Sequence, residues 1–378
     1  MKKCVIIPDS FKGSMDSIAI CRIIDETILS FYPQCQNLLV PVADGGEGTV
    51  ECFVQALSAE KIPVEATGPY DEPITVSYGR TGATAIVEMA MCAGLPQVED
   101  RKNPGLTTTS GVGLVIKKAV QDGCRKIILG LGGSCTNDGG TGMAHALGVR
   151  FYKASGEAFR PTGATLHLID KIDASQTESL LRNVEVTAMC DIDNPLYGPT
   201  GAAYVFGPQK GADKEQVLLL DEGLQNLARV ILKSLGKDVA RLPGSGAAGG
   251  MGAGVAAFLN GSLQSGIQTV LNTVGFDELI KDADLIFTGE GKIDGQSLRG
   301  KVVIGVAERA KAQGIPVIAI VGDVGDDAEG AYERGVSAIF SINRVAVDFE
   351  KARLRSPQDL KSTVEALMRF SKACRPKG

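Results

Sequence analysis

The sequence predicts an α/β protein in which a first domain, built on a mostly parallel sheet from both ends of the chain, is interrupted by a second, mixed α/β domain. Three observations predict this fold class. Short apolar runs alternate with amphipathic helical patterns near both termini, which is typical of βαβ units. Several of these runs end in turns rich in glycine and carboxylates. Between the two ends lie stretches with strand and turn signals, and 378 residues are enough for two or three domains.

The N-terminal region contains two strand–turn–helix units. Cys4–Ile7 is a short apolar run that predicts a central strand, and the turn PDSFKGS follows it. Apolar residues then recur at helical spacing over 20–31. Leu38–Val42 predicts the next strand, which runs into ADGGEGT and a helix over 47–57. Both turns place polar side chains at the carboxyl end of a strand, where open α/β sheets bind their ligands.

The stretch IILGLGGSCTNDGGTG has the strongest signal for a binding loop. Ile127–Leu131 predicts a buried strand, and a helix is expected at about Gly140–Leu147. Glycines allow a sharp turn and the close approach of a ligand to backbone N–H groups, and a helix N-terminus suits a phosphate. The earlier ADGGEGT turn has the same order, with Asp44 in the place of Asp138. The sequence therefore predicts two similar glycine-rich strand ends.

The remaining elements follow from the same patterns. The other predicted strands are Val64–Thr67, Ile74–Tyr78, Ala85–Met89, Val184–Met189, Ala203–Phe206, Leu285–Thr288, Pro316–Val321 and Ala338–Ile342. The first three of these are separated by turn residues and predict antiparallel pairing. The other predicted helices are Ser110–Gln121, Gln216–Leu235, Val255–Asn260, Val302–Gln313 and Ser356–Cys374. We place the first domain at 1–62, 103–140 and 278–378, and the second at 63–102 and 141–277.

The composition argues against several function classes. A net charge of −5 disfavours nucleic acid as a partner, and the absence of Trp with only 5% aromatic residues disfavours a base-stacking surface. No run of 18 apolar residues and no signal-like segment is present, so we expect no membrane span and a cytoplasmic location. The nine cysteines show no CxxC spacing and indicate small buried side chains. Cys135 alone lies in the glycine-rich loop, and its role stays open.

The motifs that remain favour phosphoryl transfer. Gly295–Lys301 matches GxxxxGK, but Val302 stands where a P-loop needs Ser or Thr. The GxGxxA match that begins at Gly252 follows more glycine rather than a strand, and two histidines are too few for a histidine metal site. Carboxylates, hydroxyls, lysines and glycines at strand ends are what phosphoryl transfer requires.

Six stretches taken together resemble the bacterial type-I glycerate kinase family. They are, in order, PDSFKGS, VADGGEGT, GLGGSCTNDGGTG, CDIDNPLYGPTGAAYVFGPQKGA, GSGAAGGMGAG and FTGEGKIDGQSLRGK. The resemblance covers the chain from Lys2 to about Phe370. Cys135 departs from this pattern, because the family often has Ala there. The resemblance implies a discontinuous flavodoxin- or Rossmann-like domain with a second, inserted mixed α/β domain.

The resemblance also implies an activity. It implies an ATP- and Mg²⁺-dependent enzyme that phosphorylates D-glycerate, and closely similar members use the 2-hydroxyl. We expect the protein to act as a monomer or homodimer. Two alternatives stay open: phosphorylation at the 3-hydroxyl, and a non-catalytic sensor of a small anion or nucleotide on the same scaffold.

Roles are assigned to polar residues at the strand ends and in the glycine-rich loops. The predicted catalytic residues are Asp191, Lys12 and Asp44, with Asp191 chosen because it ends a strand that faces a long glycine-rich loop. Glu290 and Asp294 are the predicted metal ligands, since Mg²⁺ needs only one or two carboxylates. The predicted substrate- and nucleotide-binding residues are Ser10, Gly45, Gly46, Glu47, Ser134, Thr136, Asn137, Asp138, Asn194, Lys210, Gly249, Gly250 and Lys292.

Overall fold

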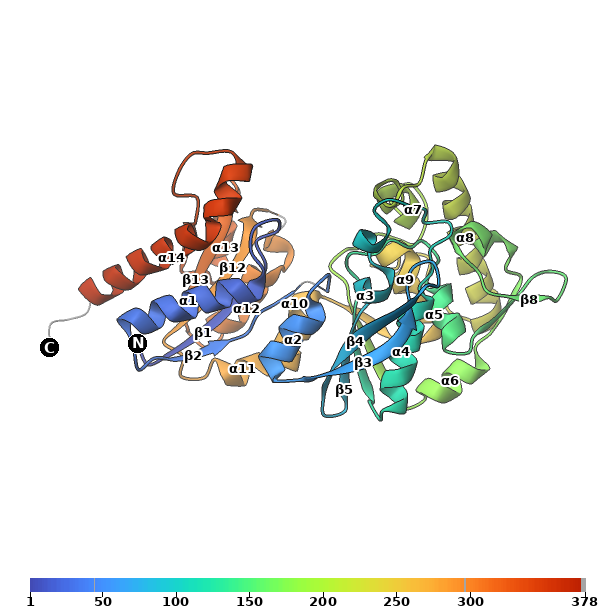
Figure 1. Ribbon diagram of the computed structural model, residues 1–378, viewed down its shortest axis with the longest axis horizontal. Helices are drawn as coiled ribbons and strands as arrows, with labels where there is room; N and C mark the ends of the chain where they lie inside the picture. The colour runs from blue at the N-terminus through green and yellow to red at the C-terminus, as the bar shows by residue number, and fades with distance from the viewer. Residues whose placement is uncertain (44, 296, 375–378) are drawn as a thin grey trace. The chain divides into compact units, whose positions relative to one another are not determined.

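The computed structural model describes residues 1–43, 45–295 and 297–374. The chain forms two compact units (Figure 1). Unit 1 comprises Met1–Ala43, Gln55–Leu57 and Gly266–Gly378. Unit 2 comprises Asp44–Val54 and Ser58–Ser265. The predicted architecture, a discontinuous domain from both ends of the chain with a second domain inserted, is confirmed.

Unit 1 is built on a parallel sheet of five strands in the order β14-β13-β12-β1-β2. The strands are β1 (Lys3–Pro8), β2 (Gln36–Leu39), β12 (Leu285–Ile293), β13 (Val317–Val324) and β14 (Ala338–Ser341). If the five strands are numbered 1 to 5 in chain order, their spatial order from the β2 edge is 2-1-3-4-5, as in flavodoxin-like sheets. The strand order reverses between β1 and β12, and at such a point doubly wound folds bind their ligands.

Helices cover this sheet because their apolar stripes face it. They are α1 (Ser17–Phe31), α10 (Gly266–Thr273), α11 (Phe276–Leu279), η4 (Ser297–Arg299), α12 (Val302–Lys311), α13 (Gly330–Glu333) and α14 (Phe349–Ala373). Helices α1 and α14 lie side by side (Figure 1). Their buried residues, among them Ile24, Ile28, Leu360 and Val364, share one core cluster. The Asp16 side chain caps α1 by accepting a hydrogen bond from the Ala19 N–H at 2.7 Å.

Unit 2 contains a mixed sheet of six strands in the order β11-β10-β6-β5-β4-β3. The strands are β3 (Glu60–Thr67), β4 (Pro73–Thr81), β5 (Thr84–Glu88), β6 (Lys126–Gly130), β10 (Glu185–Met189) and β11 (Ser262–Gln264). The predicted antiparallel pairing of the first three strands is confirmed. From β5 to β11 all pairs are parallel, so the carboxyl ends of β6 and β10 meet at one edge.

Short helices and a small sheet complete unit 2. The helices are α3 (Ala90–Ala93), η1 (Leu95–Val98), α4 (Ser110–Gln121), α5 (Thr141–Ala146), η2 (Gly163–Leu168), α6 (Ser175–Leu181), α7 (Ala202–Phe206), η3 (Pro208–Lys210), α8 (Lys214–Leu235) and α9 (Ala247–Phe258), while α2 (Thr49–Leu57) contributes to both units. The small antiparallel sheet joins β7 (Arg150–Tyr152), β8 (Ala158–Phe159) and β9 (Lys171–Asp173).

The structure differs in several places from the domains and elements predicted from the sequence. The segment 103–140 belongs to unit 2, because its strand β6 pairs with β5 and β10 and not with the unit 1 sheet. Residues 45–54 and 58–62 likewise belong to unit 2, whereas residues 266–277, predicted in the second domain, belong to unit 1. Residues Ala202–Phe206 form a helix rather than a strand, and α14 begins at Phe349, where Asp348 caps it.

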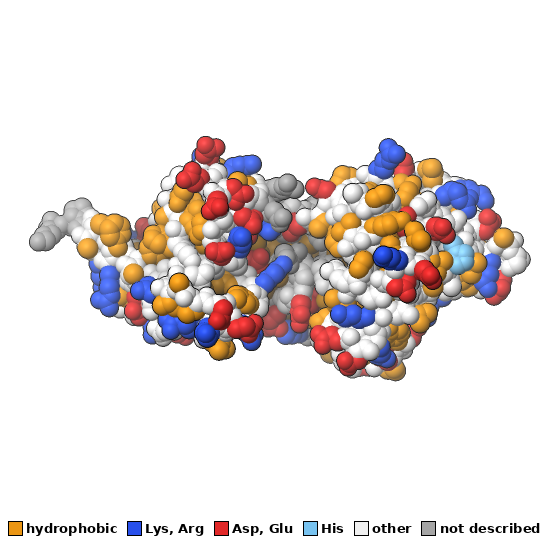
Figure 2. Space-filling model, turned by 90° about the horizontal axis from the view of Figure 1, so that it is seen from above, with side chains coloured by type: hydrophobic (Ala, Val, Ile, Leu, Met, Phe, Trp, Pro, Cys, Tyr) orange, Lys and Arg blue, Asp and Glu red, His pale blue; other side chains and the backbone are white. Residues whose placement is uncertain are grey.

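The surface agrees with the composition. On the face shown in Figure 2, acidic and basic side chains are interspersed, with no broad basic region. None of the helices in the described part of the chain combines the length and the apolar character that crossing a bilayer requires. Seven of the nine cysteines are buried, and all nine are free thiols.

Candidate functional site

A cavity of about 250 Å³ lies in unit 2 where β6 and β10 end. Because these strands are parallel neighbours, the loops that follow them open on the same edge of the sheet. The cavity is lined by Leu95, Leu131, Gly132, Gly133, Ser134, Met189, Cys190, Asp191, Ile192, Phe206, Gln209, Lys210, Ala247 and Ala248. Three of the predicted site residues, Ser134, Asp191 and Lys210, are thus brought together.

Lys210 is the charged group buried in the wall of this cavity. Its side chain is 3% exposed. The ammonium donates hydrogen bonds to Ser134 Oγ at 2.8 Å and to the carbonyl oxygen of Thr136 at 2.7 Å. Within the described part of the chain it forms no ion pair with a carboxylate. Burial lowers its pKa to about 8. A buried cation without a counter-charge in a cavity wall favours an anionic ligand.

The loop from Ser134 to Asp138 is held in place by backbone hydrogen bonds, while some of its polar side-chain atoms have no hydrogen-bond partner. The Cys135 N–H donates to the Ala93 carbonyl at 2.9 Å. The Thr136 hydroxyl and both polar atoms of the Asn137 side chain are buried without a hydrogen-bond partner, and such groups are costly unless a ligand or water satisfies them. Burial raises the pKa of the Cys135 thiol to about 12, so this thiol stays protonated and is a poor nucleophile.

Asp138 holds the framework of the loop and does not line the cavity. Its fully buried carboxylate accepts hydrogen bonds from the Thr109 N–H at 2.9 Å and from Thr109 Oγ1 at 2.8 Å. It also accepts from the N–H groups of Gly140 at 3.1 Å and Gly142 at 3.2 Å. Burial raises its pKa, and these hydrogen bonds lower it. The carboxylate thereby joins the first turns of α4 and α5.

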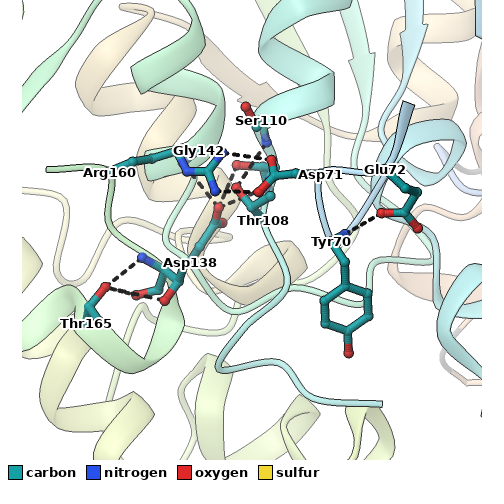
Figure 3. A network of polar contacts seen from close by, with 11 residues as sticks. Tyr70, Asp71, Glu72, Thr108, Ser110, Asp138, Gly142, Arg160 and Thr165 are labelled. Carbon is teal, nitrogen blue, oxygen red and sulfur yellow. Dashed lines mark hydrogen bonds and ion pairs between the residues drawn. The ribbon is translucent and has the colours of Figure 1, made fainter. Parts of the chain in front are cut away.

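An ion pair lies beside this carboxylate. Arg160 donates to both carboxylate oxygens of Asp71, at 2.7 Å to Oδ1. The hydrogen bond with Asp71 is the main cause of the raised pKa of Arg160. Figure 3 shows the guanidinium close to Asp138, whose charge raises this pKa further. The pair ties the turn between β3 and β4 to the segment around the binding loop.

The substitution Thr109→Val tests this framework. It keeps the shape of the side chain but removes the hydroxyl that donates to Asp138 and accepts from the Met143 N–H at 2.8 Å. Two buried polar groups then lose a partner, so we expect the free energy of unfolding to fall by about 1–3 kcal/mol. Urea unfolding followed by circular dichroism measures this. The exposed Thr75→Val is the control, expected to change by less than about 0.5 kcal/mol. Equal effects of the two substitutions would contradict the role given to Asp138.

Two further glycine-rich loops pack against the ends of β6 and β10. The carbonyl oxygen of Gly45 accepts a hydrogen bond from the Gly132 N–H at 2.8 Å. Residues Ala248–Gly250 are left-handed, and a Cβ at Gly249 would lie 2.0 Å from the Thr136 carbonyl oxygen. Only glycine fits at this contact. The loops that were predicted separately therefore meet around the binding loop.

The other predicted residues of unit 2 take different places. Glu47 lines a second cavity of about 440 Å³ together with Glu51 and Glu88. Gly46 precedes it in the same loop, and Gly250 packs with Gly249 against the binding loop. The Asn194 side chain donates to the Thr200 carbonyl at 2.8 Å, which fixes its own loop. Asp44 lies outside the described residues.

The predicted residues of unit 1 gather at the edge where the strand order reverses. Glu290 lies in the last part of β12 and is 5% exposed, and its Oε1 is buried without a hydrogen-bond partner. Burial raises its pKa to about 7, a hydrogen bond from Ser297 and the charge of Lys301 lower it, and the charges of Asp9 and Asp294 raise it. Ser10 and Lys12 follow β1 at the same edge, and Lys292 follows Glu290 on β12. Lys292 lies 3.8 Å from Asp323, both side chains being more than half exposed.

Several residues of the unit 2 cavity were missed. Phe206 and Gln209 line it because α7 and η3 fold back over the binding loop. Gln209 could have been found from its position next to Lys210, which was predicted. The hydrogen bonds of Thr109 to Asp138 and the ion pair of Arg160 with Asp71 carry no signal in the sequence, because the two residues of each pair lie 29 or more positions apart and meet only after folding.

Comparisons with known proteins agree with this architecture. The profile of the Glycerate kinase family matches residues 4–372. The Glycerate kinase of Bacillus cereus is 46% identical over 366 residues, which is 96% of each chain. The Glycerate 2-kinase of Escherichia coli is 43% identical over 343 residues, 90% of each chain. The crystal structure of a proposed glycerate kinase 2 from Salmonella typhimurium LT2 superimposes with a TM-score of 0.87 at 39% identity and 98% coverage of both chains. The chain therefore belongs to the glycerate kinase family.

Proposed function

We propose that this protein is a kinase that transfers the γ-phosphoryl group of ATP to the 2-hydroxyl of D-glycerate, giving 2-phosphoglycerate and ADP. The observation that carries the proposal is the buried ammonium of Lys210 in the wall of the 250 Å³ cavity, without a carboxylate partner among the described residues. A small carboxylic acid supplies the missing charge. The name of the Escherichia coli relative supports the 2-hydroxyl as the acceptor.

The residues of the cavity have two roles toward glycerate: some bind its carboxylate and one accepts the proton of its hydroxyl. The Lys210 ammonium and the Ser134 hydroxyl bind the carboxylate of glycerate, as charge-assisted hydrogen bonds. Asp191 is an exposed residue of the cavity lining, at the end of β10. Its carboxylate accepts the proton that the attacking hydroxyl loses as the new P–O bond forms, the part that an aspartate plays in many kinases.

The second set of predicted residues suits a metal and phosphates. No group of three or more His, Cys, Asp and Glu arranged to hold a metal ion occurs among the described residues. Mg²⁺ does not need one, because it keeps several waters and binds through one or two carboxylates and the substrate phosphates. The orphaned oxygen of Glu290 fits such a ligand. We propose that Glu290 and Asp294 hold Mg²⁺, which neutralises phosphate charge when bound, and that Lys12, Ser10 and Lys292 contact the phosphates.

The experiment is ³¹P NMR of the purified protein with MgATP and D-glycerate. A new phosphomonoester doublet, split by one CH proton, is the expected result. A triplet, split by a CH₂ group, would mean that the 3-hydroxyl is the acceptor. Intact ATP in the presence of folded protein would instead favour the sensor alternative.

A further inference from the structure

An exposed apolar cluster lies at the carboxyl edge of the unit 1 sheet. Strand β14 ends at Ser341, and the loop that leaves it leads to α14. Along this loop and at the first residue of α14 the side chains of Val345, Val347 and Phe349 are 44%, 43% and 58% exposed. Exposed apolar residues that gather in one place mark binding surfaces more often than scattered ones do.

The cluster adjoins the loop that carries Lys12. A Cβ at Gly13 would lie 3.3 Å from Cζ of Phe349. A Cβ at Gly291 would lie 3.5 Å from the backbone nitrogen of Lys12. Phe349, the Lys12–Gly13 turn and the Glu290–Gly291 segment of β12 are therefore successive neighbours along the edge of one sheet.

This order of groups matches the chemistry of a nucleotide. The flat face of an aromatic ring can stack on any nucleobase. A lysine attracts the phosphates, and a carboxylate oxygen without a hydrogen-bond partner suits the cation that the phosphates bind. The row lies beside the junction of β1 and β12, where the strand order reverses and open α/β sheets bind ligands. A small hydroxy acid has no part that uses an apolar ring.

We propose that the adenine base of ATP stacks on Phe349, with the phosphates directed along Lys12 toward Glu290. The proposal rests on the ATP dependence of the proposed function and deepens it by assigning the base a place. Phe349 then contributes to nucleotide affinity without contacting the hydroxy acid.

Phe370 provides a matched control. It is the same residue type on the same helix, 69% exposed, and 21 residues further along α14, about 30 Å at 1.5 Å per residue. Phe349→Ala is expected to weaken ATP binding about tenfold, measured by titration calorimetry, and to leave the affinity for inorganic tripolyphosphate within twofold. Phe370→Ala is expected to change neither. Equal ATP affinity of the wild type and Phe349→Ala would overturn the proposal, as would an equal loss for tripolyphosphate.

A fluorescent variant gives a direct readout. The chain contains no Trp, so Phe349→Trp introduces a single indole at the site and retains a ring on which the base can stack. We expect its ATP affinity to match the wild type and its emission to change on addition of ATP, but not of tripolyphosphate. A silent Phe349→Trp signal together with unchanged binding in Phe349→Ala would refute the assignment. These measurements use ATP alone, so a protein that binds ATP through Phe349 but fails to phosphorylate glycerate refutes only the proposed reaction.

Discussion

Replacing Lys210 by methionine is expected to lower kcat/KM for glycerate by about 10³-fold, the size of effect found when a preorganised donor to developing or bound charge is removed. Methionine has a similar volume, so the cavity keeps its shape. The lost hydrogen bonds to Ser134 and Thr136 cost stability, while removal of a desolvated charge restores some of it. The free energy of unfolding should therefore stay within about 2 kcal/mol of the wild type.

Steady-state kinetics and denaturant unfolding of the same preparation separate the two effects. Lys214→Met, on the exposed start of α8, is the control and should retain activity. If Lys210→Met kept the wild-type kcat/KM for glycerate, the Lys210 ammonium would have no role in binding this substrate.

The pH dependence of the wild type gives the same residue a second test. Burial lowers the pKa of Lys210 to about 8, while the proximity of Cys135 and Asp138 raises it. Only the ammonium form attracts the carboxylate, so kcat/KM for glycerate should be level below pH 8 and fall about tenfold per unit well above it. The residual activity of Lys210→Met should not show this fall in kcat/KM above pH 8.

Replacing Asp191 by asparagine is expected to lower kcat by about 10²- to 10⁴-fold with little change in the KM of glycerate. The amide keeps the size of the side chain but cannot accept the proton of the attacking hydroxyl, and general-base catalysis contributes this much. Rapid-quench measurement of one turnover tests the chemical step itself.

Asp193 offers a close comparison, because it is also exposed and lies two residues further along the same loop. Asp193→Asn should turn over like the wild type. If kcat fell in Asp193→Asn and not in Asp191→Asn, the general base would be Asp193 and the assignment to Asp191 would be wrong.

Local patterns were enough to predict most of the elements. Helix α4 occurs at the predicted residues, Ser110–Gln121. Strand β6 was predicted within one residue, because a buried strand followed by glycines has few other interpretations. The segment Ala203–Phe206 was predicted as a short strand, yet residues Ala202–Phe206 form a helix that packs on α8 and α9. Tertiary contacts override weak local propensities.

The candidate site was predictable only in part, for a related reason. Ser134 was chosen from the glycine-rich turn after a strand, Asp191 from the end of a strand that faces a glycine-rich loop, and Lys210 from that loop. The structure places all three on one cavity. Asp138 looked like a ligand-binding residue by the same signal, but its oxygens are satisfied by Thr109 and two glycines. Sequence identifies a carboxylate at a strand end, whereas only the fold determines which donors reach it.

The insertion of unit 2 into unit 1 has a consequence for the order of events during synthesis. Strand β1 pairs on one side with β2 and on the other with β12, where Cys4 lies beside Leu285. This second edge of β1 therefore waits for a partner made about 280 residues later. Unit 2 ends at Ser265, before that partner emerges. Domains fold as their chains become complete, and pairing across such a separation is slow. We therefore expect proteolysis of nascent chains to reveal a resistant unit 2 while the apolar strand at the N-terminus is still open to a chaperone.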